Sequence, residues 1–235
     1  KTSTLKCLSG LLYPTSGEVT VLGFKPSDRK SAYKKQFALV MGQKNQLWWD
    51  LPPMETFLLN KEIYEIPNDD FHQTLNELIE LLDVKDIINV QVRKLSLGQR
   101  MKCELIAALI HHPKVLFLDE PTIGLDVTMQ KNVRDFIKIY NQKYRATIIL
   151  TSHYMDDVKE LCDRIIVIDH GQIMFDGQLK QIIDKYAQHK ILTVTFSDTC
   201  NLHELEKIGQ IKSYKYPLAR ILVPRNVAAK QAAAL

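Results

Sequence analysis

Residues 94–126 read KLSLGQRMKCELIAALIHHPKVLFLDEPTIGLD and combine two apolar patterns with a pair of acids. A helical pattern of apolar residues covers 98–112 and stops at Pro113, which cannot continue a helix. The apolar run VLFL (115–118) follows and ends in two adjacent carboxylates. Open α/β sheets bind ligands at the carboxyl ends of their strands. The stretch therefore predicts a helix, a buried strand and a ligand site at the end of that strand.

Other apolar runs indicate what surrounds this strand. TIIL (147–150) and IIVI (165–168) are also short and continuously apolar, and helical patterns alternate with them. EVTVLG (18–23) and FALVMG (37–42) read as two further short strands. Because uniformly apolar strands alternate with helices, the sequence predicts an α/β fold with a parallel sheet covered on both faces.

Two regions differ from this alternation. An apolar stripe predicts a helix between residues 71 and 82, formed by Phe71, Leu75, Leu78, Ile79 and Leu82. Near the C-terminus, apolar and other residues alternate over 191–196, which predicts a half-solvated strand in a small separate layer. The last stretch, 228–235, has the pattern of a helix.

Composition narrows the class of protein. The chain has 235 residues, 46% of them hydrophobic and 25% charged, which suits one large domain or one and a half. A net charge of +4, spread along the chain, does not indicate nucleic-acid binding. The four cysteines are far apart without a CxxC pair, so we expect reduced thiols in a cytosolic compartment. The apolar runs, such as 105–110, are too short to span a bilayer.

The two carboxylates after VLFL can take different roles at a phosphate-binding site. Asp119 can hold Mg²⁺ through water, and Glu120 can polarise an attacking water. The alternative is a solvated acidic pair at a strand end. Such a strand often accompanies a phosphate-binding loop of the form GxxxxGK(S/T), and Lys1 and Thr2 fit its last two positions. A hydroxyl residue at a helix start is also commonly only a cap.

Residues 94–126 resemble the signature, Walker B and D-loop motifs of ATP-binding cassette (ABC) ATPases, in the right order and at close spacing. Gln43 in VMGQ matches the Q-loop glutamine of that family, and His153 in TIILTSHYMDDV matches its switch histidine. The five motifs occur in order over roughly the first 180 residues. The chain is therefore similar to the nucleotide-binding domain of an ABC transporter.

The resemblance implies a P-loop NTPase (RecA-like) core with an inserted helical subdomain and a small C-terminal α+β extension. We expect the core at 1–43 and 110–180, the helical subdomain at 44–109 and the extension at 181–235. It also implies ATP and Mg²⁺ as cofactors, a transmembrane permease on a separate chain, a second ATP-binding domain that forms a homodimer with the first, and no nucleic-acid partner. The expected location is the cytoplasmic face of the cell membrane, reached through the permease.

Individual roles follow from the same resemblance. Phosphate and metal contacts are implied for Lys1, Thr2 and Ser3. Gln43 is expected to sense the γ-phosphate and metal, and Asp119 to support Mg²⁺. Glu120 is the implied general base. The remaining implied roles are a γ-phosphate contact for His153, organisation of the domain–domain contact by Asp126, and action on the ATP of the opposite domain by Ser96, Gly98 and Gln99.

Two departures from the family pattern affect the expected activity. The chain starts at the Walker A lysine, so we expect a fragment that lacks the upstream glycines and binds ATP poorly. The usual signature is LSGGQ, and here Leu97 replaces its first glycine. A bulky side chain near the phosphate path places the hydrolysis rate in question.

The string GQKNQLWWDLP (42–52), with the LSLGQR variant, resembles bacterial exporter-type ABC subunits. Trp48 and Trp49 suit either an aromatic docking surface or the core of the helical subdomain. Two rival functions are a soluble ABC ATPase that acts in translation or on DNA, and a catalytically impaired regulatory subunit. The first is disfavoured by a single signature motif and a short insertion, and the second by the presence of Asp119, Glu120 and His153.

Overall fold

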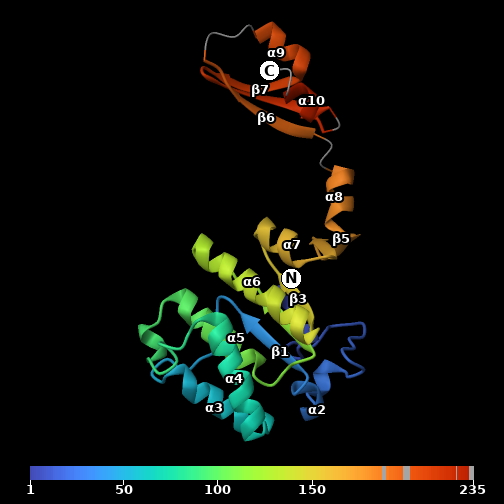
Figure 1. Cartoon of the computed structure of the whole chain (residues 1–235). Coiled ribbons are helices and arrows are strands. Elements are labelled where there is room, and N and C mark those ends of the chain that lie inside the picture. Colours follow the sequence, from blue (N-terminus) through green and yellow to red (C-terminus); the bar gives the residue numbers. More distant parts are fainter. Residues whose placement is uncertain (187–188, 198–201, 226, 233–235) are drawn as a thin grey trace. The chain divides into compact units, whose positions relative to one another are not determined.

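The structure is a computed structural model that describes residues 1–186, 189–197, 202–225 and 227–232. The chain forms two compact units, Lys1–Leu161 and Cys162–Leu235 (Figure 1). The finer division predicted from the sequence, into core, helical subdomain and extension, stays a prediction.

The first unit is built on a parallel sheet. It contains β1 (Phe37–Met41), β2 (Val115–Asp119) and β3 (Thr147–Thr151), in that spatial order. The last residues of the three strands lie side by side in the register, so their carboxyl ends form one edge. The three strands predicted at these positions and their parallel arrangement are confirmed.

Helices of two lengths accompany this sheet. The long helices are α3 (Pro53–Tyr64), α4 (Asn68–Leu82), α5 (Leu97–Leu109) and α6 (Val127–Tyr144). The short elements are α1 (Thr2–Leu8), α2 (Ser31–Lys34), α7 (Met155–Leu161) and the 3₁₀ turns η1 (Pro26–Asp28) and η2 (Val92–Lys94). The apolar stripe predicted between residues 71 and 82 is the buried face of α4.

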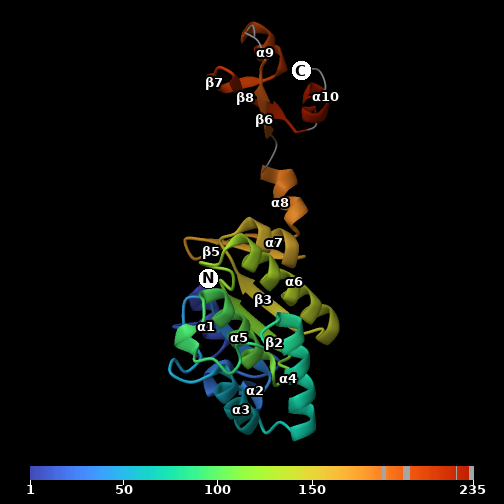
Figure 2. The ribbon, with the colours of Figure 1, turned by 60° about the vertical axis from the view of Figure 1, so that its left-hand side comes forward.

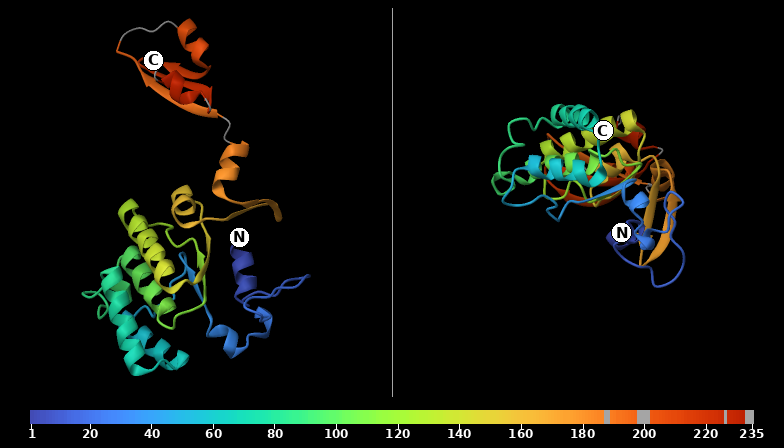
Figure 3. Two further views of the ribbon diagram at one scale, coloured as in Figure 1. Left: turned by 45° about the vertical axis from the view of Figure 1, so that its right-hand side comes forward. Right: turned by 90° about the horizontal axis from the view of Figure 1, so that it is seen from below.

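The sheet is covered on both faces, as predicted. Alternate residues point to opposite sides of a strand. Ala38 and Leu116 belong to the main core, which α3 to α6 complete on one side (Figures 2 and 3). Val115 and Phe117 pack with Leu5 of α1 on the other side (Figure 3). The loops at the carboxyl edge therefore extend from a sheet that is held from both faces.

Two of the predicted strands differ in the structure. Residues 18–23 make only an isolated bridge between Val21 and Phe24, because Leu22 and Gly23 both take positive φ (51° and 77°) and reverse the chain at once. The run 165–168 does form a strand, but it is antiparallel.

This strand, β4 (Ile165–Asp169), pairs with β5 (Gln172–Gly177). The turn residues His170 and Gly171 have φ of 44° and 78°. Two successive positive φ values are typical of the tight turn that joins an antiparallel hairpin. This local turn explains why an apolar run that resembles a parallel strand pairs antiparallel.

The second unit also contains a small antiparallel sheet. Its strands are β6 (His189–Thr195), β8 (Leu218–Pro224) and β7 (Gln210–Lys215), with β8 in the centre, and its helices are α8 (Leu179–Tyr186), α9 (Leu202–Ile208) and α10 (Ala228–Ala232). Leu192, Val194 and Phe196 pack against its apolar core, which confirms the half-solvated strand and the α+β character. The predicted terminal helix is α10, and 233–235 lie outside the described residues. Among the described helices, none has a stretch both long and apolar enough to cross a bilayer.

Candidate functional site

The carboxyl edge of the sheet joins the start of the chain to the end of β2. Thr2 Oγ1 donates a hydrogen bond to Asp119 Oδ1 at 2.9 Å, and Thr151 Oγ1 donates to the same oxygen at 2.7 Å. Lys1 and Ser3, on either side of Thr2, are exposed. The structure thus brings the predicted metal ligands Thr2 and Asp119 together. It adds Thr151, which the sequence analysis did not single out.

Glu120 and His153 face each other across the ends of β2 and β3. His153 Nε2 lies 2.8 Å from Glu120 Oε1. The carboxylate is 15% exposed and the imidazole 68%, so the histidine covers the open side of the acid. Glu120 has a φ of +55°, and its N–H donates to the carbonyl oxygen of Thr151 at 3.0 Å. A left-handed backbone at a non-glycine residue costs roughly 1–3 kcal/mol and is concentrated at functional sites.

Gly42 brings the end of β1 against this pair. Its N–H donates to the carbonyl oxygen of Asp119 at 2.9 Å. A Cβ at residue 42 would lie 2.1 Å from the carbonyl oxygen of Glu120, far inside van der Waals contact. Only glycine therefore permits this approach, and the approach fixes where the next residue, Gln43, leaves the strand.

Gln43 lines a cavity of about 460 Å³ between three segments. The lining comes from the loop after β1 (Gly42, Gln43, Lys44, Asn45), from α5 (Leu97, Arg100, Met101, Glu104) and from the loop after β2 (Ile123, Gly124). Glu104 is 4% exposed, and its Oε1 accepts a hydrogen bond from the Gln46 N–H at 3.2 Å. Burial raises the pKa of Glu104 to about 7, although the Gln46 bond and the Arg100 charge lower it in part. The sequence analysis did not find this acid.

The remaining predicted residues gather at the starts of α5 and α6. Ser96 and Gln99 form a capping box: the Ser96 hydroxyl accepts from the Gln99 N–H at 3.2 Å, and the Ser96 N–H donates to Gln99 Oε1 at 2.9 Å. Asp126 caps α6 by accepting from the Met129 N–H at 2.9 Å. Gly98 is packed on Met129, whose Cγ would be 2.7 Å from a Cβ at residue 98. Within the described part of the chain, no hydrogen bond or ion pair joins this cluster to the Glu120–His153 pair.

Residues 1–123, just over half of the chain, match the family model described as ABC transporter. The chain belongs to this family. It is 32% identical over 212 residues to ABC transporter G family member 20 of Dictyostelium discoideum, covering 90% of this chain but only 28% of that protein. It is 29% identical over 184 residues to the ABC transporter ATP-binding protein NatA of Bacillus subtilis strain 168, covering 78% of this chain and 74% of NatA.

A solved structure supports the fold. The dimeric post-hydrolysis state of the ATP-binding cassette MJ0796, bound to ADP and Pi, superposes with a TM-score of 0.66 at 21% identity. The superposition covers 76% of this chain and 80% of that chain. The predicted ABC family and the P-loop NTPase fold are therefore confirmed.

Leu97 lies in the first turn of α5, where the ABC signature usually has a glycine. It adopts ordinary helical geometry and is 39% exposed. Its Cδ2 would be 3.1 Å from a Cβ on Gly124, so the side chain leans toward the loop after β2. The substitution is accommodated without backbone strain in this ABC domain.

The edge of the sheet suits magnesium better than a soft metal. The described residues contain no group of three or more His, Cys, Asp or Glu that could hold an ion by itself. Mg²⁺ is usually held by one or two oxygen ligands, with water and phosphate oxygens completing its shell. The Thr2 hydroxyl and the Asp119 carboxylate, which are hydrogen-bonded to each other, form such an oxygen pair. The residues present therefore fit Mg²⁺ in the company of a nucleotide.

Trp48 and Trp49 are not core residues, so that alternative is wrong. Their side chains are 53% and 48% exposed. The Arg100 guanidinium lies 5.1 Å from the centre of the Trp49 ring, a cation–π contact that steadies one indole on the surface. The pair forms an exposed aromatic patch on the loop after β1.

Sequence reasoning missed a buried polar cluster behind the Glu120–His153 pair. It consists of Thr122, Arg134, Ser152 and Asp157. A pair of aspartates in the first turn of a helix is usually explained by the helix dipole. The only signal in the sequence for this cluster was therefore the position of Asp157, which lies on α7 four residues after His153.

Proposed function

We propose that this chain binds and hydrolyses ATP to power an ABC membrane transporter of the exporter type. The observation that carries this proposal is the 2.8 Å contact between Glu120 and His153 at the carboxyl edge of the sheet, next to the Thr2–Asp119 pair. A carboxylate covered by an imidazole, with a metal-ligand pair beside it, has the parts that phosphoryl transfer to water requires.

Glu120 acts as the general base. As the oxygen of water attacks the γ-phosphorus, its proton passes to the Glu120 carboxylate, and the bond from the γ-phosphorus to the bridging oxygen breaks to release ADP. His153, on the exposed side of that carboxylate, directs its ring toward the γ-phosphate and keeps Glu120 in place. The backbone of Glu120, held by Thr151, fixes the direction from which the proton is taken.

Asp119 and Thr2 hold Mg²⁺, which supplies neutralisation of the phosphate charge when bound. Lys1 and Ser3 complete the phosphate contacts from the start of α1. Gln43, at the rim of the cavity beside α5, senses the γ-phosphate and metal and reports them to the partner chain. The close backbone approach at Gly42 fixes the position at which Gln43 leaves β1.

A second copy of the chain completes the site. Ser96, Gly98 and Gln99 stand at the start of α5 and make no hydrogen bond or ion pair to Glu120 or His153 among the described residues, which suits action on ATP held by the other copy. The N-terminal end of α5 carries unpaired N–H groups that favour a phosphate. Asp126, as the cap of α6, holds the adjacent loop against this surface.

The permease is a separate membrane-spanning chain, and it holds this domain at the cytoplasmic face of the membrane. The Trp48–Trp49 patch follows Gln43 directly, so docking there connects the membrane partner to the residue that senses the γ-phosphate. No part of the proposal requires a nucleic acid.

Removal of the metal tests the proposed chemistry. In the protein as its gene encodes it, EDTA is expected to abolish phosphate release from ATP, and excess Mg²⁺ to restore it. Asp119→Asn is expected to raise the Mg²⁺ concentration for half-maximal release by at least about tenfold, because the variant loses the negative charge that would hold the ion. Asp135→Asn, which changes an exposed acid on α6, is the matched control. Release that is unaffected by EDTA would contradict the proposal.

The docking role of the aromatic patch has a separate test. Trp48→Ala with Trp49→Ala is expected to weaken capture of the purified permease by about 2 kcal/mol or more, since exposed tryptophans are typical interface anchors. The melting temperature is expected to stay unchanged because both side chains are exposed. Ile63→Ala, a substitution of another exposed apolar residue (54%), is the control. A lower melting temperature with unchanged capture would assign the pair a structural role.

A further inference from the structure

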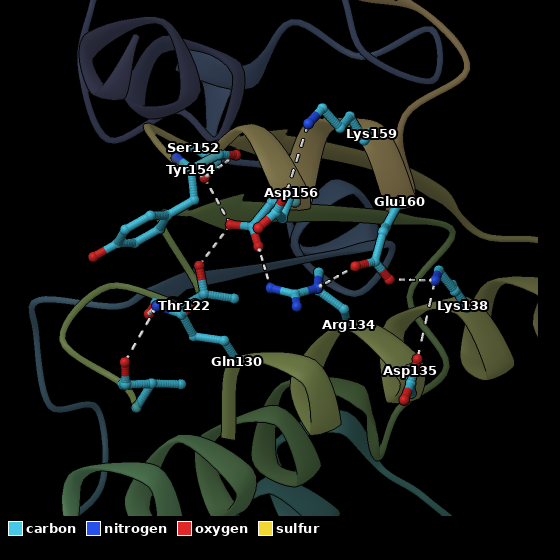
Figure 4. Close-up of polar contacts among 12 residues, drawn as sticks. Thr122, Gln130, Arg134, Asp135, Lys138, Ser152, Tyr154, Asp156, Lys159 and Glu160 are labelled. Carbon is cyan, nitrogen blue, oxygen red and sulfur yellow. Dashed lines mark hydrogen bonds and ion pairs between the residues drawn. The ribbon is translucent and has the colours of Figure 1, made fainter. Parts of the chain in front are cut away.

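Asp157 is the central residue of the buried polar cluster behind the site. Its side chain is fully buried, and its two oxygens accept three hydrogen bonds. Oδ2 accepts from the Thr122 hydroxyl at 2.5 Å and from the Ser152 hydroxyl at 2.6 Å, and Oδ1 accepts from Arg134 at 3.2 Å. Figure 4 shows these three partners arriving from different segments of the chain. A buried carboxylate with this many donors is fixed in place.

The charge of Asp157 is balanced from α6. Arg134 is 6% exposed and is the cationic partner of the buried carboxylate. Its Nε also lies 3.2 Å from Glu160 Oε1, an ion pair without hydrogen-bond geometry, and Lys138 pairs with the other oxygen of Glu160 at 2.7 Å (Figure 4). This outer layer is partly exposed, so it stabilises less than the inner bonds do.

The two hydroxyls that meet on Asp157 belong to the two loops that carry the proposed catalytic groups. Thr122 is fully buried and stands two residues after Glu120. Ser152 immediately precedes His153, and its hydroxyl also accepts from the Tyr154 N–H at 2.9 Å. One carboxylate therefore joins the loop after β2 to the loop after β3 from behind.

We propose that Asp157 is a positioning residue that sets the Glu120–His153 geometry by clamping both loops. This inference rests on the proposed function of that pair. The two strand ends are already joined by Thr151, but both loops extend beyond that contact. Without the clamp, Glu120 and His153 can shift relative to each other, and a displacement of about 1 Å can cost roughly 100-fold in rate.

The direct test compares two neighbouring aspartates on α7. Asp157→Asn is expected to lower kcat for ATP by about 100-fold, as such misplacement does. The KM for ATP is expected to change by less than about threefold, since the phosphate contacts at Lys1 and Thr2 are untouched. Asp156→Asn makes the same chemical change at an exposed residue (71%) and is expected to leave both constants unchanged. Both constants are referred to the fraction of protein that binds ATP, because loss of folded protein alone would also lower the apparent kcat at constant KM. With this normalisation, a purely structural role would leave kcat unchanged.

Two further variants keep the test decisive if Asp157→Asn folds poorly. Thr122→Val and Ser152→Ala each remove one arm of the clamp while Arg134 still balances the Asp157 charge. Each is expected to lower kcat by about tenfold at constant KM. This loss is smaller than the one expected for Asp157→Asn because only one of the two loops is released. Thr122→Val combined with Ser152→Ala is expected to lower kcat further than either change alone, because both loops are then released from Asp157.

The turnover of Glu120→Gln, measured in the same assay, separates the proposed function of the site from the clamp by Asp157. If turnover depends on Glu120 while Thr122→Val and Ser152→Ala keep the wild-type kcat, the clamp is overturned and the proposed function stands. A fall in melting temperature shared with Glu160→Gln, without a change in kcat, also overturns it. If Glu120→Gln keeps the wild-type rate, Glu120 is not the general base and the clamp fails with that assignment, while ATP hydrolysis itself stands. Wild-type protein that shows no ATP turnover would instead contradict the proposed function.

Discussion

Glu120→Gln is expected to stop ATP turnover and leave an ATP-bound dimer that does not reopen. The amide keeps the size of the side chain, but it cannot take the proton from the attacking water. General-base catalysis is worth roughly 100- to 10,000-fold, so the residual rate is expected at about 1% or less. The substitution leaves Thr2 and Asp119 hydrogen-bonded to each other, so nucleotide binding remains.

Two measurements decide this prediction. Phosphate release under multiple turnover gives the rate, and size-exclusion chromatography with ATP and Mg²⁺ shows the dimer. Glu62→Gln, at an exposed residue of α3, is the matched acid-to-amide control. Phosphate release by Glu120→Gln at the wild-type rate would remove Glu120 from the role of general base.

Glu104→Gln is expected to stabilise the protein at neutral and alkaline pH. Burial raises the pKa of Glu104 from 4.5 to about 7 in the folded state. Between these two values the folded protein binds more protons than the unfolded chain, so stability from this group falls as pH rises from 4.5 to 7 and stays low above it. A shift of this size corresponds to about 3 kcal/mol. Glutamine removes the charge and retains an oxygen that accepts from the Gln46 N–H.

The free energy of unfolding of the variant is therefore expected to exceed that of the wild type by up to about 3 kcal/mol at pH 8, and to equal it near pH 4. Urea unfolding of both proteins at a series of pH values measures this difference in free energy. The contributions of the other titrating groups are common to both proteins and cancel. The exposed substitution Glu62→Gln is expected to give no such trend. A difference between Glu104→Gln and wild type that is the same at every pH would show that Glu104 is not a strained buried acid.

The fold could be predicted where the apolar pattern of a segment matches its burial and strand pairing in the structure. The run before Asp119 is apolar on both faces, and in the structure both faces of β2 are buried. The run 165–168 has the same pattern, but the two-residue turn at His170–Gly171 determines its pairing. That outcome depends on two backbone angles, which a hydrophobicity pattern does not contain.

The candidate site shows the same limit. Thr2, Asp119, Glu120 and His153 could be found because they stand in short motifs that resemble those of the ABC family and occur in the family's order. Asp157 and Glu104 could not, because their importance comes from burial and from partners distant in sequence: Asp157 lies 35 positions from Thr122, and Glu104 lies 58 from Gln46. Charged residues are normally exposed, so neither acid was expected inside the protein.

ATP hydrolysis at this site is tested by phosphate release from γ-labelled ATP in the presence of Mg²⁺, measured for the protein as its gene encodes it and for His153→Ala. We expect steady release by the wild type and a loss of about 100-fold in the variant, with ATP still bound, because His153 holds Glu120 and contacts the γ-phosphate. Wild-type protein that binds ATP but releases no phosphate, or a variant with wild-type release, would contradict it.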